Sequence, residues 1–211
     1  MDKSGRMNRS ASGDGAGPSR KRERPAGKAP SEARLHEAAL AHLARFAATE
    51  AGLARVLTRR VDRWARRAEA EGQDHEQVLA AAGTARMAAQ QVARKLAGSG
   101  VVDDAAFAAS RARRLARGGR SRRAIAAHLS AKGVAGEVAQ AVLPDDELGA
   151  ALMLCRRRRF GPFAREEMTP EVRLKALAAM ARAGFAHGVA TTALGMEPEA
   201  AEDRVRALRD G

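Results

Sequence analysis

The chain has 211 residues, 45% of them hydrophobic and 3% aromatic, with 38 Lys and Arg against 25 Asp and Glu, a formal net charge of +13. This apolar content supports a folded core, and the excess of Ala, Leu, Arg and Glu over β-branched and aromatic runs predicts an all-α protein. The lone cysteine, Cys155, excludes an internal disulfide, and because we find no apolar signal segment or membrane span, we expect a cytoplasmic protein with no membrane contact.

The positive charge is uneven along the sequence. Lys and Arg outnumber Asp and Glu by 9 to 4 over residues 1–34, by 10 to 7 over 35–100 and by 8 to 3 over 101–143, whereas 144–211 holds 11 of each. Such an excess is typical of proteins that bind nucleic acid or an acidic protein surface. A genome rich in Arg and Ala codons would also raise both residues, and this alternative stays open.

Residues 1–34 are predicted to be a disordered basic tail. They are rich in Gly, Ser, Pro, Lys and Arg and hold almost no large apolar side chain, so they cannot bury enough surface to offset the entropy of ordering. The tail is either an electrostatic arm or a tolerated extension.

Residues 35–98 are predicted to form a first, divergent unit of three helices. A first helix runs to about Ala48, and Thr49 caps the second. The third spans about 74–97, where Met87 belongs to a weak apolar stripe and Gly83 is a candidate interruption. The apolar stripes of the first two helices are Leu35, Ala39, Leu43 and Phe46, then Leu53, Val56, Leu57, Val61 and Trp64.

Residues 99–144 are predicted to form a second three-helix unit. Asp103 or Asp104 caps its first helix, which ends at a Gly-Gly pair. Ser121 caps the next helix, and Gly133 supplies the left-handed backbone that closes it. A short third helix follows from about Gly136.

Residues 145–211 are predicted to hold a third three-helix unit plus a C-terminal extension. Thr169 and Pro170 mark a helix start, and a weaker copy of the second unit recurs at an offset of 51, pairing Gly133 with Gly184. Units repeated in this way stack on their neighbours because none buries its apolar face alone. We therefore predict an elongated array of three tandem three-helix repeats, an architecture that mostly serves binding.

The second unit resembles the RecX regulatory proteins of bacteria, which bind the recombinase RecA. The resemblance rests on DDAAFA, a basic helix, Gly-Gly, an apolar pair and Lys-Gly-Val, and it extends over about residues 35–195. The residues of this signature are Asp104, Phe107, Ala108, Gly119, Ile125, Leu129, Gly133 and Val134, with Gly184 and Phe185 at the matching turn of the third unit.

This resemblance implies a curved, all-helical regulator that lies in the groove of a RecA filament on single-stranded DNA. Such a protein would mainly inhibit recombinase and ATPase activity and thereby affect DNA repair and the SOS response. It would act as a monomer, without cofactor or metal.

The candidate contacts to a partner are basic side chains. Arg111 falls inside the apolar arc of its helix, so it snorkels, pairs with a carboxylate or serves a neighbouring surface. Arg120, Arg122 and Arg123 gather at a helix N-terminus, where backbone N–H groups favour anions. A solvated face is the competing interpretation. The full candidate set is Arg111, Arg114, Arg117, Arg120, Arg122, Arg123, Lys132 and Arg173.

The sequence offers little for catalysis. The five histidines have no metal-ligand spacing with one another or with Cys155, and neither a phosphate-binding glycine motif nor a nucleophile elbow occurs. The run Arg156–Arg159 spreads around a helix, and the helix dipole near its C-terminus explains part of it. We expect no enzyme.

A DNA-binding transcription regulator of helix-turn-helix type is the alternative function. Two short helices joined at Gly118-Gly119, the second of them basic, resemble that motif. However, residues 121–131 contain no Asn or Gln to read bases, and one Trp without any Tyr gives no obvious stacking platform. We therefore expect weak, salt-sensitive and sequence-independent binding to bare DNA.

Overall fold

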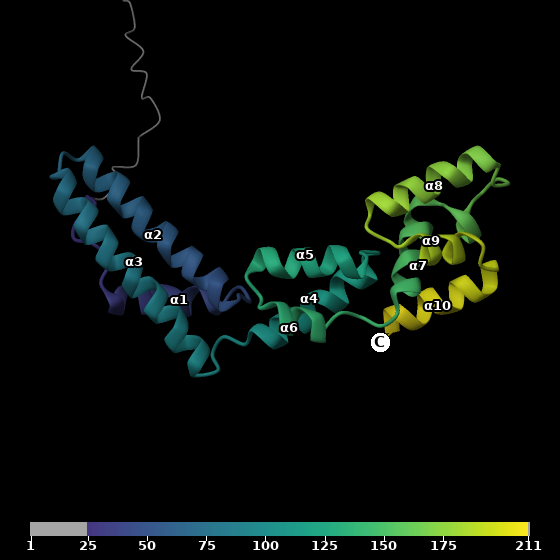
Figure 1. Cartoon of the computed structure of the whole chain (residues 1–211). Coiled ribbons are helices and arrows are strands. Elements are labelled where there is room, and N and C mark those ends of the chain that lie inside the picture. The colour runs from purple at the N-terminus through teal and green to yellow at the C-terminus, as the bar shows by residue number, and fades with distance from the viewer. Residues whose placement is uncertain (1–24, 211) are drawn as a thin grey trace, which may run out of the picture.

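The computed structural model describes residues 25–210, and within that range the chain is helical with no β-strand (Figure 1). The all-α prediction is confirmed. The helices are α1 (Glu32–Leu43), α2 (Glu50–Ala70), α3 (His75–Gly98), α4 (Asp104–Arg117), α5 (Arg122–Lys132), α6 (Gly136–Ala141), α7 (Glu147–Arg158), the 3-10 turn η1 (Gly161–Phe163), α8 (Pro170–Arg182), α9 (His187–Leu194) and α10 (Pro198–Asp210).

The helices follow one another in three groups along a shallow arc, α1 to α3, α4 to α6 and α7 to α9 (Figure 1). This arrangement confirms the elongated array. The C-terminal stretch after the third group is also a helix, α10, and it packs on α7.

Helix starts follow the sequence signals. The side chains of Thr49, Asp103, Ser121 and Thr169 each accept a hydrogen bond from the backbone N–H three residues on, at 2.9, 2.8, 3.2 and 3.4 Å. The sequence allowed either Asp103 or Asp104 as the cap of α4, and the structure shows that it is Asp103. Asp104 instead accepts from the backbone N–H of Glu50 at 2.8 Å, and so ties α4 to the start of α2.

The prediction for the first helix was wrong at its C-terminal end. α1 ends at Leu43 rather than near Ala48, and Phe46 lies beyond it with 54% of its surface exposed. The buried Thr49 must take a non-helical conformation to cap α2, so the chain leaves the helix before that point.

The third helix also differs from its prediction. α3 runs without interruption through Gly83, and Met87 points to solvent with 61% of its surface exposed. The buried positions are mostly small ones, which lets α3 lie close against α2 along their shared length. These positions are Val78, Ala82, Ala85, Ala89, Val92, Ala93 and Leu96.

The last ten residues of the predicted disordered tail, 25–34, are ordered in the structure. Residues 25–34 have a defined course, because Ser31 caps α1 and Trp64 Nε1 donates to the carbonyl of Gly27 at 3.0 Å. The predicted disorder of residues 1–24 concerns a segment outside the described residues.

The described chain has two hydrophobic cores rather than three interdependent ones. The first belongs to α1 to α3 and includes Leu53, Leu57 and Val61, whereas the second runs continuously from α4 to α10. The first group buries its own apolar face because α2 and α3, of 21 and 24 residues, pack along each other and cover α1. The expectation that every unit depends on its neighbours was therefore wrong for the first.

Both junctions between groups repeat one polar contact. The hydroxyl of Thr49, the N-cap of α2, donates to the carbonyl of Lys132 at 2.7 Å. The hydroxyl of Ser121, the N-cap of α5, donates to the carbonyl of Ala183 at 2.8 Å. Each acceptor directly precedes a glycine with positive φ, Gly133 at 86° and Gly184 at 91°. The N-cap of one group's second helix thus binds the C-terminal turn of the next group's second helix.

Candidate anion-binding site

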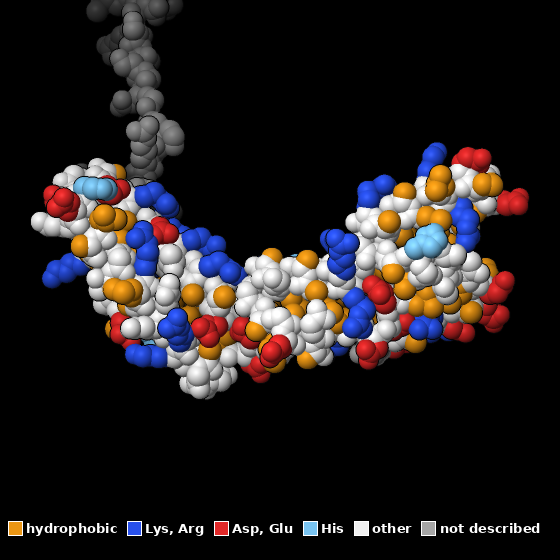
Figure 2. Space-filling model, in the orientation of Figure 1, with side chains coloured by type: hydrophobic (Ala, Val, Ile, Leu, Met, Phe, Trp, Pro, Cys, Tyr) orange, Lys and Arg blue, Asp and Glu red, His pale blue; other side chains and the backbone are white. Residues whose placement is uncertain are grey.

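Four arginines from three segments line a hollow of about 350 Å³ between the α4–α5 turn, α7 and the C-terminal end of α8. We call Arg120, Arg157, Arg158 and Arg182 the junction cluster. Its walls are completed by Leu154, Phe160, Ala179 and Ala183, so the lining residues include no carboxylate. Figure 2 shows basic side chains over this junction and along α2, on the side towards which the arc opens.

The junction depends on a close approach between the turn after α4 and the backbone of α7. Gly119 is buried in that turn with φ at 73°, and a Cβ added there would lie 2.8 Å from the backbone nitrogen of Leu154. Arg157 Nη1 donates to the carbonyl of Gly118 at 3.0 Å across the same gap. These contacts place Arg120 beside the end of α7.

Most of the cluster's charge is uncompensated within residues 25–210. Arg120, Arg158 and Arg182 are exposed and form no ion pair or hydrogen bond with another described side chain. Arg156, by contrast, pairs with Glu202 at 3.3 Å. Guanidinium groups in such a setting suit phosphate or carboxylate groups, which they bind through paired N–H donors.

The structure brings only one of the predicted contact residues, Arg120, into this cluster. The guanidinium of Arg122 is held by contacts within the protein, since its Nη1 donates to the carbonyl of Pro144 at 2.7 Å and lies 3.6 Å from Asp145 Oδ1. Arg114, Arg117, Arg123 and Lys132 are exposed on α4 and α5, and Arg173 is half-buried on α8. Sequence reasoning missed Arg157, Arg158 and Arg182, because they join Arg120 only across the packed groups.

Arg111 is half-buried and pairs with a histidine rather than a carboxylate. Its Nε–H donates to His128 Nε2 at 3.0 Å, so His128 carries its proton on Nδ1. Burial, then the charges of Arg111, Lys132 and Arg120, lower the pKa of His128 below its usual 6.5. The neutral imidazole is the form that the fold favours.

We expect an NMR titration of His128 to give a pKa below 6.5, and Arg111→Gln to raise it towards that value. Because the folded-state pKa is lowered, this group contributes stability above 6.5 that is lost as pH falls through the folded pKa. His128→Gln should remove that dependence. An unchanged His128 pKa in the Arg111 variant would show that the charge of Arg111 has no part in the shift.

Apart from Asp104, which binds the start of α2, the residues of the predicted signature lie in the second core and at its turns. Side chains with at most 5% exposure are Ala108, Ile125, Leu129, Val134 and Phe185, and Phe107 packs against them half-buried. The three turn glycines, Gly119, Gly133 and Gly184, all have positive φ.

Among the described residues, no group of three or more His, Cys, Asp and Glu side chains is placed to hold a metal ion. Cys155 is fully buried, and burial raises the pKa of its thiol to about 11, so the thiolate nucleophile is suppressed. Over the same part of the chain, each helix is too short or too polar to span a bilayer.

Fold and site together define a helical-repeat protein with a basic surface suited to anionic partners. Comparison with known proteins agrees with this class. Residues 103–143 match the family model described as RecX, second three-helix domain. The chain is 38% identical to "Regulatory protein RecX" of Myxococcus xanthus over 191 residues, which cover 86% of this chain and 96% of that protein. The chain therefore belongs to the RecX family of regulatory proteins.

Other relatives carry the same name. The chain is 39% identical over 103 residues to the RecX protein of Agrobacterium fabrum, covering 48% of this chain and 56% of that one. It is 35% identical over 144 residues to that of Mycobacterium ulcerans, covering 66% and 80%. No solved structure matches.

Proposed function

We propose that this chain binds RecA and its filament on single-stranded DNA, and that it inhibits recombinase and ATPase activity. It would thereby modulate DNA repair and the SOS response, acting as a cytoplasmic monomer. The observation that carries the proposal is the match to nearly the whole length of a curated regulatory protein of the RecX family.

The geometry supports a filament-directed role. The three helix groups form an arc with basic side chains on its open side (Figure 2), where a long, charged partner can contact several groups at once. The junction cluster lies on the continuous core of α4 to α10, which places Arg157 and Arg158 on α7, Arg182 on α8 and Arg120 in the turn packed against α7. We propose this cluster, with the exposed Arg114, Arg117, Arg123 and Lys132, as the contact surface for acidic groups of the filament.

The test is RecA ATP hydrolysis on single-stranded DNA while the protein is titrated in, with binding to bare DNA measured in parallel at physiological salt. We expect inhibition at protein concentrations well below those that coat bare DNA. The double variant Arg120→Gln with Arg182→Gln should need about tenfold more protein for half-inhibition, since two exposed charge pairs contribute up to about 1 kcal/mol each and about 1.4 kcal/mol is a factor of ten. Arg122 is unsuitable as a probe because its guanidinium holds the carbonyl of Pro144.

The matched control is Arg94→Gln with Arg209→Gln, which removes the same charge from exposed positions on α3 and α10. Equal losses in both double variants would assign the effect to net charge and contradict the proposed surface. Tight binding to bare duplex without inhibition would overturn the proposal and favour the helix-turn-helix alternative.

A further inference from the structure

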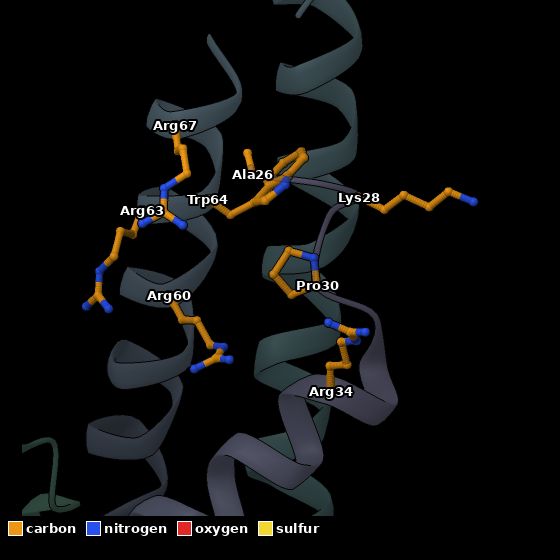
Figure 3. Close-up of a pocket in the computed structure, with 8 residues that line it drawn as sticks. All are labelled: Ala26, Lys28, Pro30, Arg34, Arg60, Arg63, Trp64 and Arg67. Atoms are coloured by element: carbon orange, nitrogen blue, oxygen red, sulfur yellow. The ribbon is translucent and has the colours of Figure 1, made fainter. Parts of the chain in front are cut away.

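The first helix group carries a second cationic cavity, far along the arc from the junction cluster. A cavity of about 250 Å³ lies between α1, α2 and the segment before α1 (Figure 3). Its lining combines five cations with an aromatic ring and includes no carboxylate. The lining residues are Ala26, Lys28, Pro30, Arg34, Arg60, Arg63, Trp64 and Arg67.

Residues 25–30, which we call the strap, form one wall of this cavity. Trp64 Nε1 donates to the carbonyl of Gly27 at 3.0 Å, and the N–H of Ala26 donates to both carboxylate oxygens of Glu71, at 2.8 and 2.9 Å. The charge of Glu71 is thereby directed to the strap backbone rather than to the arginines. The cavity is therefore shaped by specific contacts at two points of the strap.

Three of the guanidinium groups share this space. Arg60 and Arg67 are seven residues apart and lie on the same face of α2 as Trp64. Figure 3 shows them on α2 on either side of Trp64, across from the strap, while Arg34 rises from α1 towards Pro30. Arg63 and Lys28 line the cavity but point away from it in the same view.

These three arginines have no partner among the described residues. None of Arg34, Arg60 and Arg67 forms an ion pair or a side-chain hydrogen bond there, although Asp62 on the same helix pairs with Arg86 at 2.8 Å. Glu37 borders an adjoining hollow with Arg34 and Arg60 and also remains unpaired with them. Clustered like charges repel one another, and an anion bound between them would relieve that repulsion.

The chemistry favours a phosphate group carried on a nucleic acid strand. Guanidinium groups bind phosphate oxygens through paired N–H donors. The neighbouring hollow shares Arg34 and Arg60 with the cavity, so a chain can continue past the bound group. Trp64 adds aromatic surface beside these cations, the combination by which proteins bind single strands without sequence preference.

We propose that Arg34, Arg60 and Arg67 bind a backbone phosphate of single-stranded nucleic acid, with Trp64 beside the bound nucleotide. This site lies outside residues 103–143, which match the family model, and outside the junction cluster. Its failure and that of the proposed filament binding are therefore separable.

The test uses the fluorescence of Trp64, because the chain has one Trp and no Tyr and its emission reports on this cavity alone. Titration of the full-length protein with oligothymidylate should change the emission saturably. Arg60→Gln with Arg67→Gln should raise the dissociation constant about tenfold or more. It should also lower the slope of log affinity against log salt by about 0.7, the contribution of one phosphate contact on a single strand.

The matched control is Arg59→Gln with Arg66→Gln, which are exposed positions on the same helix with the same spacing and charge change. We expect the dissociation constant of this control to change by about twofold or less, whereas equal losses in both variants would overturn the site in favour of diffuse charge.

Two further probes test the ligand. If pyrophosphate bound as tightly as oligothymidylate, compared per phosphate group, the ligand would be a free phosphate compound and the proposed strand would be wrong. If polyglutamate bound as tightly as oligothymidylate, the ligand would be an acidic protein segment instead.

Discussion

Gly119→Ala is expected to lower the free energy of unfolding by about 2–5 kcal/mol, because the substitution adds two costs. A left-handed backbone costs a non-glycine residue roughly 1–2 kcal/mol, and overpacking costs roughly 1–3 kcal/mol. The backbone of Gly119 has φ at 73°, and the new Cβ would lie 2.8 Å from the nitrogen and 3.2 Å from the Cα of Leu154. Both atoms belong to the backbone of α7, so no side-chain rotation relieves the contact.

Urea unfolding followed by far-ultraviolet circular dichroism measures this change. Gly72→Ala is the matched control, since Gly72 has φ at 81° and a Cβ there would meet nothing within 4 Å. It should cost only the backbone term of about 1–2 kcal/mol. Equal losses in the two variants would show that α7 does not press against the Gly119 turn.

Gly133→Ala is expected to destabilise the junction between the first two groups by about 2–5 kcal/mol, through backbone strain plus overpacking. Gly133 has φ at 86°, and an added Cβ would overlap the Cβ of Ala51 at the start of α2. The same approach brings the carbonyl of Lys132 to Thr49 Oγ1 at 2.7 Å and to Arg55 Nη2 at 2.8 Å. Both bonds should lengthen when the two surfaces are forced apart.

This collision is between side chains, and a second substitution can remove it. Ala51→Gly in the Gly133→Ala background should recover about 1–3 kcal/mol, the overpacking part, and leave the backbone strain. A double-mutant cycle in urea unfolding measures the coupling. Purely additive effects would contradict the contact between Gly133 and Ala51.

Local signals in the sequence predicted much of the fold correctly. The N-caps Thr49, Ser121 and Thr169, the left-handed turn at Gly133 and the turn at Gly184 depend on a few neighbouring residues, so their chemistry is visible in the sequence. The periodicity of α2 likewise identified its buried face. Prediction failed for Phe46 and Met87, because an apolar residue at helical spacing is buried only where another element covers it.

The candidate sites were the least predictable feature. Helical spacing describes the faces of one helix, and it indicated that the four arginines at the end of α7 could not all share one surface, in agreement with Arg156 pairing with Glu202 while Arg157 and Arg158 line the hollow. It could not show that Arg158 and Arg182 meet Arg120, or that Arg34 meets Arg60 and Arg67, since each set joins segments distant in sequence. The contact between Trp64 and the strap was equally invisible in the sequence, because the strap reaches Trp64 only in the folded chain.

The sequence by itself determined the helical class, the positions of caps and turns, the net positive charge and the family resemblance, because each depends on composition or on residues close together in the chain. Only the tertiary structure decided which arginines converge, which are consumed by internal contacts such as Arg122 with Pro144, and that the first group has its own core. The physical reason is that helix packing is set by close approaches between surfaces, at points such as Gly119 against α7, which no local pattern encodes.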